Sequence, residues 1–293
     1  MEKLLKWSVE NSDSNKIPQP PPQDDPERRK IGSEIIDVIL GKSDGVRIRE
    51  AIEVISNTND TLENREIAFD NLEMLVEQID NANDVENMNL WPKILSFLSF
   101  PEKSLRLHAV WVCGTAVQNN PKAQKAFAEK GGIKLILNLL NNPDEDMEVR
   151  SKAIYAISGA IKHYSPGLEQ FEKEGGYEIL LSILQTSNDL SILRKVVFLF
   201  NTLLLQDATT VTTRIEEKGL AMQMIKLLGI YGDDDEDLAD KILRTLLTQL
   251  QNSSKSLSED EMNELRRILP EIKKKYGEVA LSTSEWEELE SNL

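Results

Sequence analysis

The chain has 293 residues, with 50 acidic and 34 basic side chains and a net charge of −16 at pH 7. So large a negative charge disfavours a nucleic-acid partner, because binding to the phosphate backbone depends on lysine and arginine. The one cysteine, Cys113, excludes an intrachain disulfide, which fits a reducing compartment. No segment has the ~20 consecutive apolar residues of a membrane span, and the N-terminus lacks the apolar core of a secretory signal.

Residues 1–30 begin with a short amphipathic stretch and continue into a proline-rich linker. Leu4 and Leu5 can share one helical face, with Trp7 beside them. The sequence "PQPPP" then places four prolines within five residues, which excludes a helix because proline lacks the backbone donor. We therefore predict a flexible N-terminal segment ending in an extended linker. The alternative for residues 1–12 is a frayed chain end without a role.

From about Ile31 to about Tyr276 the sequence is helical and repeats itself. An apolar residue recurs near the start of each expected long helix at spacings, by subtraction, of 41, 44, 43 and 43 residues: Ala68, Ala109, Ala153, Val196 and Ala239. A shorter apolar segment follows three of these helices and ends at Gly131, Gly175 or Gly219, where we expect left-handed helix caps. A period of ~40–47 residues with two or three helices is typical of armadillo and HEAT solenoids, and these glycines favour armadillo.

We therefore predict an all-α fold, an armadillo-like right-handed α-solenoid with helical caps and a flexible N-terminal segment. The expected parts are a cap at 31–60, repeats over 61–251, and a C-terminal cap with an acidic tail at 252–293. Within the repeat region we expect units at about 61–100, 101–142, 143–186 and 187–232 and a partial unit at 233–251. In the C-terminal cap, Ser284 is the expected N-cap of a last helix whose Trp286 and Leu289 pack on the preceding repeat.

Reactive side chains do not converge in this sequence. His108 and His163 lie one repeat apart with no partner at metal-ligand spacing, and Cys113 lies among apolar residues of a long helix. The glycine pairs lack the lysine and hydroxyl of a phosphate loop, and the acidic run 233–240 lacks the glycine and glutamate of a calcium loop. We expect no catalytic residue, no metal and no cofactor, and hence a protein-binding solenoid.

Four segments of the chain are similar to a known family: "MEKLLKWSVENS", "AFDNLEMLVEQIDNANDVENMNLW", "GTAVQNN" and "VRSKAIYAISGAIKH". The sequence resembles the cytosolic armadillo-type nucleotide exchange factors of the 70-kDa heat-shock chaperones, in their fungal form. The resemblance implies a binding protein that grips the second lobe of the chaperone's nucleotide-binding domain on its concave face and promotes ADP release. It also implies that the N-terminal segment, with Leu4, Leu5 and Trp7, acts near the chaperone's substrate-binding domain to free the client.

The resemblance also assigns contact residues. In the family, the "DNAN" segment connects the first long helix to the next helix at the rim of the concave face, so Asn81, Ala82 and Asn83 are expected to touch the chaperone. We expect Ala82 and Arg194 to be exposed in the free protein. The alternative is that this polar run only caps and turns. Arg194 is the second candidate, because it is shifted by one residue from the repeated arginines Arg106 and Arg150. That shift turns a helical side chain by roughly 100°, so we expect Arg194 to be free of their structural role; the alternative is a surface arginine paired with an acid.

Two other classes of function remain as alternatives. A generic armadillo adaptor would bind partners without exchange activity, although a carrier of basic peptides would show a regular array of tryptophan and asparagine. The corresponding columns here contain no asparagine: Asp70, Trp111, Tyr155, Phe198 and Lys241, then Met74, Thr115, Gly159, Thr202 and Thr245. An enzyme is the other alternative, and the lack of reactive clusters opposes it. No pattern indicates a coiled coil, so we expect a monomer.

Overall fold

The computed structural model describes residues 41–252 and 257–293, so the predicted client-release segment with Leu4, Leu5 and Trp7 lies outside the described residues. The chain divides into two units, Met1–Ser43 and Asp44–Leu293, and the second holds the helices described below. Every regular element of the described part is an α-helix or a 3-10 helix, with no strand among them. This confirms the predicted all-α class.

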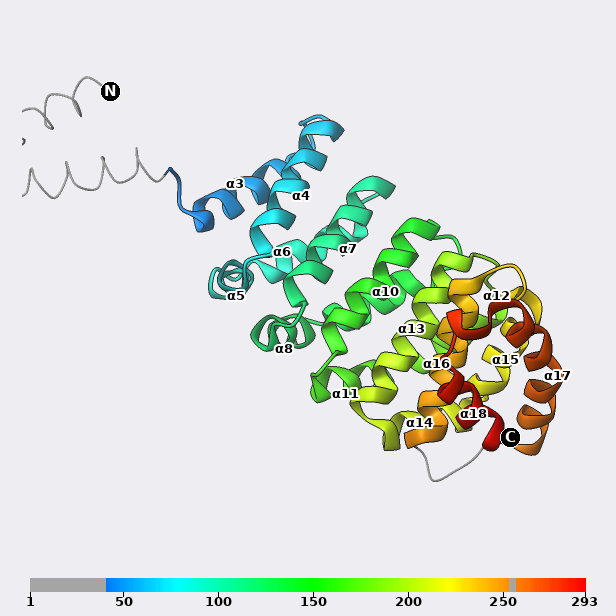
Figure 1. The fold of residues 1–293 in the computed structure, drawn as a ribbon. Helices are drawn as coiled ribbons and strands as arrows, with labels where there is room; N and C mark the ends of the chain where they lie inside the picture. The colour runs from blue at the N-terminus through cyan, green and yellow to red at the C-terminus, as the bar shows by residue number, and fades with distance from the viewer. Residues whose placement is uncertain (1–40, 253–256) are drawn as a thin grey trace, which may run out of the picture. The chain divides into compact units, whose positions relative to one another are not determined.

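Five long helices alternate with pairs of shorter ones along the second unit (Figure 1). After α3 (Asp44–Ser56), the long helices are α4 (Leu62–Val76), α7 (Lys103–Val117), α10 (Met147–Ile161), α13 (Leu190–Gln206) and α16 (Glu236–Asn252). The shorter helices are α5 (Ile79–Asn87), α6 (Trp91–Ser96) with the 3-10 turn η1 (Phe97–Ser99), α8 (Pro121–Glu129), α9 (Gly132–Asn141), α11 (Ser165–Lys173), α12 (Gly176–Thr186), α14 (Ala208–Lys218) and α15 (Leu220–Tyr231). The unit closes with α17 (Glu259–Tyr276), η2 (Gly277–Val279) and α18 (Thr283–Ser291).

Each long helix lies beside the long helix before it and the one after it, from α4 through α7, α10 and α13 to α16. The shorter helices stack in the same order, α5 on α8 on α11 and α9 on α12 on α15. One repeat therefore contacts chiefly its neighbours, which is the architecture of a helical solenoid. The predicted armadillo-like α-solenoid is confirmed.

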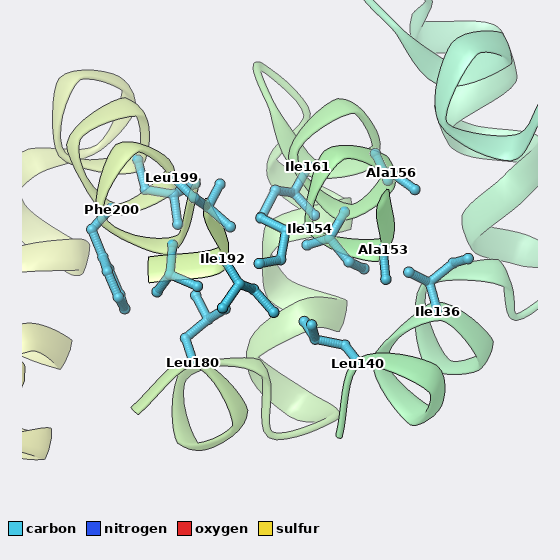
Figure 2. Close-up of a cluster of buried hydrophobic side chains, with 14 of the residues drawn as sticks. Ile136, Leu140, Ala153, Ile154, Ala156, Ile161, Leu180, Ile192, Leu199 and Phe200 are labelled. Atoms are coloured by element: carbon cyan, nitrogen blue, oxygen red, sulfur yellow. The ribbon is translucent and has the colours of Figure 1, made fainter. Parts of the chain in front are cut away.

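Apolar side chains at helical spacing hold these layers together. In α9, Ile133, Ile136, Leu137 and Leu140 recur at the three- and four-residue steps that place side chains on one face, and all are at most 1% exposed. Burial of such a side chain contributes ~1.5–3 kcal/mol. Figure 2 shows how this face meets the apolar faces of three further helices, α10, α12 and α13, with Ile154, Leu180 and Phe200 among the buried side chains.

The three predicted glycine caps lie at the junctions between short helices. Gly131, Gly175 and Gly219 have φ of 80°, 78° and 65°, the left-handed conformation that side chains with a Cβ disfavour. This confirms the sequence prediction. Gly176, which follows Gly175, is needed for a steric reason instead, because a Cβ at this position would lie 2.3 Å from the buried ring of Phe171.

The C-terminal cap is anchored as expected, but by a different serine. Trp286 and Leu289 are 2% and 0% exposed, and Trp286 Nε1 donates to the carbonyl oxygen of Gly277 at 2.7 Å. The prediction that Ser284 caps the last helix was wrong. Ser282 is the N-cap, because Glu285, three residues later, accepts from the backbone and hydroxyl of Ser282 and completes a reciprocal capping box.

Among the described helices, none combines the length and the apolar composition needed to cross a membrane. Within residues 41–252 and 257–293, no group of three or more His, Cys, Asp or Glu side chains is placed to hold a metal ion.

Two neighbouring substitutions separate backbone strain from steric crowding in the same turn. Gly175→Ala should destabilise the protein by about 1–2 kcal/mol, because alanine must adopt the left-handed conformation in open space. Gly176→Ala should cost about 1–3 kcal/mol for a different reason, the contact of its Cβ with the Phe171 ring. Thermal unfolding followed by circular dichroism measures both, with Gly176→Ala/Phe171→Leu as the variant that relieves only the crowding. An unchanged Tm for Gly176→Ala would show that the Phe171 ring shifts freely.

Candidate functional site

The polar run after the first long helix forms a helix of its own. Residues Ile79–Asn87 make up α5, so the expectation of a connecting segment at these positions was wrong. The reason lies in the apolar residues hidden in the run: Ala82 and Val85, three residues apart, are 1% and 0% exposed and turn one side of α5 to the core. The segment is therefore the first short helix of its repeat.

Two of the three residues assigned to this run are buried, and for Ala82 the expectation of exposure was wrong. Ala82 packs in the core, and Asn81 is 9% exposed. Asn81 Nδ2 donates to the Leu75 carbonyl oxygen at the end of α4 (2.9 Å) and to Asp44 at the start of α3 (3.1 Å). Asn81 thus ties three helix ends together, because a buried amide needs hydrogen-bond partners. Asn83 alone of the three stays partly exposed.

Arg194 has the same kind of structural role as Arg106, although its one-residue shift along the helix predicted that it would not. Its guanidinium donates to the Asp235 carboxylate, with Nε at 3.1 Å from Oδ1. In the same way Arg106 of α7 binds Glu145, with both donor–acceptor distances at 2.8 Å. Arg106 and Arg194 thus each pair with an acid that precedes the next long helix, whereas Arg150 donates to the Leu140 carbonyl oxygen instead. The expectation that Arg194 is free of a structural role was wrong.

The Asp235 carboxylate serves two helices. Besides binding Arg194 of α13, its Oδ1 accepts from the backbone N–H of Leu238 in the first turn of α16 at 2.9 Å. The hydrogen bond from Arg194 holds the pKa of Asp235 below its ordinary value. Arg194 itself keeps 35% of its side chain exposed, so it can still meet a partner molecule.

One side of the long helices remains open, and we call it the long-helix face. It consists of exposed or partly exposed residues from successive long helices: Asp70 and Met74 of α4, His108, Trp111 and Thr115 of α7, Lys152 and Tyr155 of α10, Lys195, Phe198 and Thr202 of α13, and Lys241 of α16. Met74 and Phe198 are 66% and 53% exposed. Exposed apolar side chains of this size on several adjoining helices are typical of a protein-binding surface.

Contacts between neighbouring helices make this face continuous at its N-terminal half. The His108 ring stacks between Phe69 and Trp111, and its Nδ1 lies 3.2 Å from Asp70. In the next row, the Thr115 hydroxyl donates to Glu73 at 2.7 Å. These side chains cross from α4 to α7, so the two helices present a single surface.

Lysines and aromatic rings occupy the centre of the long-helix face. Lys152 Nζ lies 3.9 Å from the centre of the Trp111 ring, within the range of a cation–π interaction. Lys195 Nζ donates to the hydroxyl of Ser151, which joins α13 to α10. Sequence reasoning missed both lysines. The signal was present, because His108, Lys152 and Lys195 each precede an aromatic residue by three positions in consecutive repeats.

The remaining candidate reactive groups are structural in the described part of the chain. Cys113 is fully buried in α7, and that burial raises the pKa of its thiol to about 12, so the reactive thiolate is suppressed. His163 has a positive φ of 55° at the end of α10, where its backbone N–H donates to the Gln206 side chain. His108 is held by ring stacking.

Comparison with known proteins agrees with this architecture. A designed armadillo repeat protein of known structure superposes with a TM-score of 0.63 at 12% identity, over 83% of this chain and 97% of that one. The described fold is therefore that of the armadillo repeat class. Residues 1–85 match the family described as "Nucleotide exchange factor Fes1", and residues 81–227 match the family described as "SIL1/FES1/HPBP1 C-terminal domain".

Similar proteins from fungi extend the match along the chain. A protein of Schizosaccharomyces pombe named "Hsp70 nucleotide exchange factor fes1" is 34% identical over 98% of this chain and 97% of its own length. A protein of Gibberella zeae named "Hsp70 nucleotide exchange factor FES1" is 36% identical over 57% of this chain and 79% of its own. The chain belongs to the Fes1 family.

The link between Arg194 and Asp235 makes a prediction about stability and pH. Arg194→Ala should destabilise the fold by about 1 kcal/mol, and Asp235→Ala by more, because it also removes the cap of α16. Since the folded-state pKa of Asp235 is depressed, its contribution is complete above the unfolded pKa of ~4 and is lost as pH falls through the lower folded value.

Thermal unfolding of wild type and Arg194→Ala across pH tests this link. The difference in Tm should be constant between pH ~5 and ~8 and shrink below pH ~4. Lys226→Ala, an exposed lysine of α15, serves as the control for loss of one positive charge. A Tm difference that persists undiminished in acid would exclude the Asp235 carboxylate as the source.

Proposed function

We propose that this protein is a nucleotide exchange factor that binds the nucleotide-binding domain of a cytosolic 70-kDa heat-shock chaperone and promotes ADP release. Membership of the Fes1 family carries the proposal, because the similar fungal proteins are named Hsp70 nucleotide exchange factors. The open long-helix face supports it, since it offers a row of rings and charges wide enough for a protein surface. The second lobe of the nucleotide-binding domain is the part we place against this face.

Such a factor acts by differential binding. It accelerates ADP release only if it holds the open, nucleotide-free arrangement of the two lobes more tightly than the closed one. By linkage, ADP must then weaken the binding of the factor by the same ratio. A solenoid suits this work, because neighbouring repeats support each other and the face keeps its own form against the lobe. Client release would follow when ATP replaces ADP.

The residues named from sequence mark two ends of the proposed contact. Asn83 on α5 is the accessible member of the first group, while Asn81 and Ala82 position α5 beneath it. Arg194 on α13 is the other end, and its partly exposed guanidinium, fixed by Asp235, can donate to the chaperone. Fixing a long side chain before binding reduces the entropy lost on contact.

The proposal also assigns a role in client release to the N-terminal segment. Leu4, Leu5 and Trp7 would reach the substrate-binding domain of the chaperone from the end of the proline-rich linker and help to release the client. A tether raises the local concentration of the apolar peptide once the solenoid is bound. We place this activity in the cytoplasm, with the protein acting as a monomer and without a cofactor.

A generic adaptor without exchange activity is the alternative. It would bind the chaperone equally well in the presence and absence of ADP, because equal affinity for two states shifts neither. Measurement of the dissociation constant in both nucleotide states therefore separates the two functions.

The protein should accelerate the release of labelled ADP from a cytosolic 70-kDa chaperone, observed by stopped-flow fluorescence. Acceleration should grow with protein concentration and saturate as the complex forms. ADP should lower the affinity of the protein for the chaperone. The factor should equal the one by which the protein lowers the affinity of the chaperone for ADP. A folded sample that leaves the release rate unchanged at micromolar concentration would refute the proposed exchange activity.

Deletion of residues 1–30 tests the proposed role of the N-terminal segment in client release. The helices of Asp44–Leu293 form their own unit, so the truncated protein should keep its Tm and accelerate ADP release as the full chain does. Release of a bound client peptide should become slower. Leu4→Ser/Leu5→Ser/Trp7→Ser in the full chain controls for the loss of length. A normal rate of client release by both variants would remove the proposed role of the segment.

A further inference from the structure

Two lysines at the centre of the long-helix face, Lys152 and Lys195, form no ion pair with a described carboxylate, and Glu73 attracts Lys152 only at longer range. Several other described lysines are matched by acids across repeats, among them Lys103 with Asp146 and Glu148, Lys130 with Glu86, Lys134 with Glu174, and Lys218 with Glu178, whereas exposed lysines such as Lys122 and Lys226 are not. What distinguishes Lys152 and Lys195 is that they lie near each other beside aromatic rings on an open face, where one anionic group of a partner can reach both.

The surroundings of Lys152 make its charge costly in the free protein. Burial beside the aromatic rings lowers the pKa of the Lys152 ammonium, and the nearby charge of Lys195 lowers it further, while Glu73 opposes both. The Trp111 ring at 3.9 Å and the Tyr155 ring at 5.5 Å compensate only in part. A carboxylate placed between the two ammonium groups would relieve both the desolvation and the repulsion.

Lys195 stands at the edge of a small cavity next to an exposed ring. Ser191, Arg194, Lys195, Phe198, Asp237 and Lys241 line this cavity of about 210 Å³ between α13 and α16. Phe198 is 53% exposed. The cavity has room for one side chain, and its wall combines an apolar ring with donors and one carboxylate, Asp237, which already pairs with Arg194 and Lys241. An apolar side chain can therefore enter beside Phe198 while an acid next to it reaches Lys195.

We propose that Lys152 and Lys195, with Trp111, Tyr155 and Phe198, form the central subsite of the long-helix face and bind an acidic segment of the chaperone's nucleotide-binding domain. A carboxylate of the partner lies between the two ammonium groups, and an apolar side chain beside it covers Phe198. This inference rests on the proposed function and adds to it the chemical class of the surface that is recognised. Arg194 lines the same cavity as Lys195 and Phe198, and Asn83 of α5 lies toward the N-terminal end of the same contact.

The charges in this subsite should act on both the rate and the strength of binding. Complementary charges accelerate association at low salt, and this acceleration weakens as salt screens it. Truncating one member of a buried charge pair accelerates dissociation, because the partner's charge stays buried without its counterion. Loss of both lysines should therefore weaken binding at least tenfold and flatten the dependence of the association rate on salt.

Binding of the full-length variants to a full-length cytosolic 70-kDa chaperone without nucleotide tests the subsite. Lys152→Gln/Lys195→Gln should raise the Kd at least tenfold, with unchanged circular dichroism and Tm. Lys152→Arg/Lys195→Arg keeps both charges and should stay within about threefold of wild type, since an Arg can pair with the same carboxylate. Lys226→Gln/Lys274→Gln, on exposed positions of α15 and α17, matches the loss of two positive charges outside the long-helix face and should leave the Kd unchanged.

The outcomes separate the two proposals. If the wild-type protein binds the chaperone, and Lys152→Gln/Lys195→Gln binds it with the same Kd and the same salt dependence, the proposed subsite is wrong. The proposed exchange function is not affected by that result. Loss of binding in the glutamine pair that the arginine pair does not restore also overturns it, because charge would then not be the recognised property. A wild-type chain that does not bind the chaperone overturns the exchange function and the subsite together.

Discussion

No repeat of this protein can bury its apolar side alone. Each long helix covers the one before it, and the shorter helices close the other side, so that α9, α10, α12 and α13 form one stretch of a core that continues into the next repeat. The glycines at the junctions, the N-terminal caps and the arginine–acid links between successive long helices all serve this stacking. The open long-helix face is a consequence of this stacking, because one side of each long helix remains uncovered after its neighbours are packed.

The sequence predicted the parts of the fold that depend on local conformation. Gly175 could be placed at a left-handed turn because only a residue without Cβ accepts that conformation at no cost, and the spacing of 41 to 44 residues showed the repeat. The helical nature of α5 was missed because polar residues outnumber apolar ones. Two buried residues, Ala82 and Val85, stabilise this helix because α4 and α8 pack against it. The local sequence of the segment does not reveal these tertiary contacts.

The candidate site was predicted less well, for a physical reason. The role of Arg194 depends on where Asp235 lies in space. Arg194 is shifted by one residue relative to Arg106, but its long side chain still reaches an acid, because the position of that acid is shifted as well. Asn81 was identified as important, but its buried hydrogen bonds serve the ends of α3 and α4. Lys152 and Lys195 each precede an aromatic residue by three positions in the sequence, but only the structure showed that they lie near each other beside the rings of Trp111 and Tyr155.

Asp235 connects two consecutive long helices through a single carboxylate, as a cap for α16 and a counterion for Arg194 of α13. In evolutionary terms, positions 194 and 235 are epistatic. A chain that has lost Asp235 keeps for Arg194 only the longer contact with Asp237, at 3.7 Å, and a chain that has lost the arginine still needs Asp235 as the cap of α16. The order of change therefore has a direction: the arginine can be replaced first at modest cost, whereas losing the acid first removes both interactions in one step.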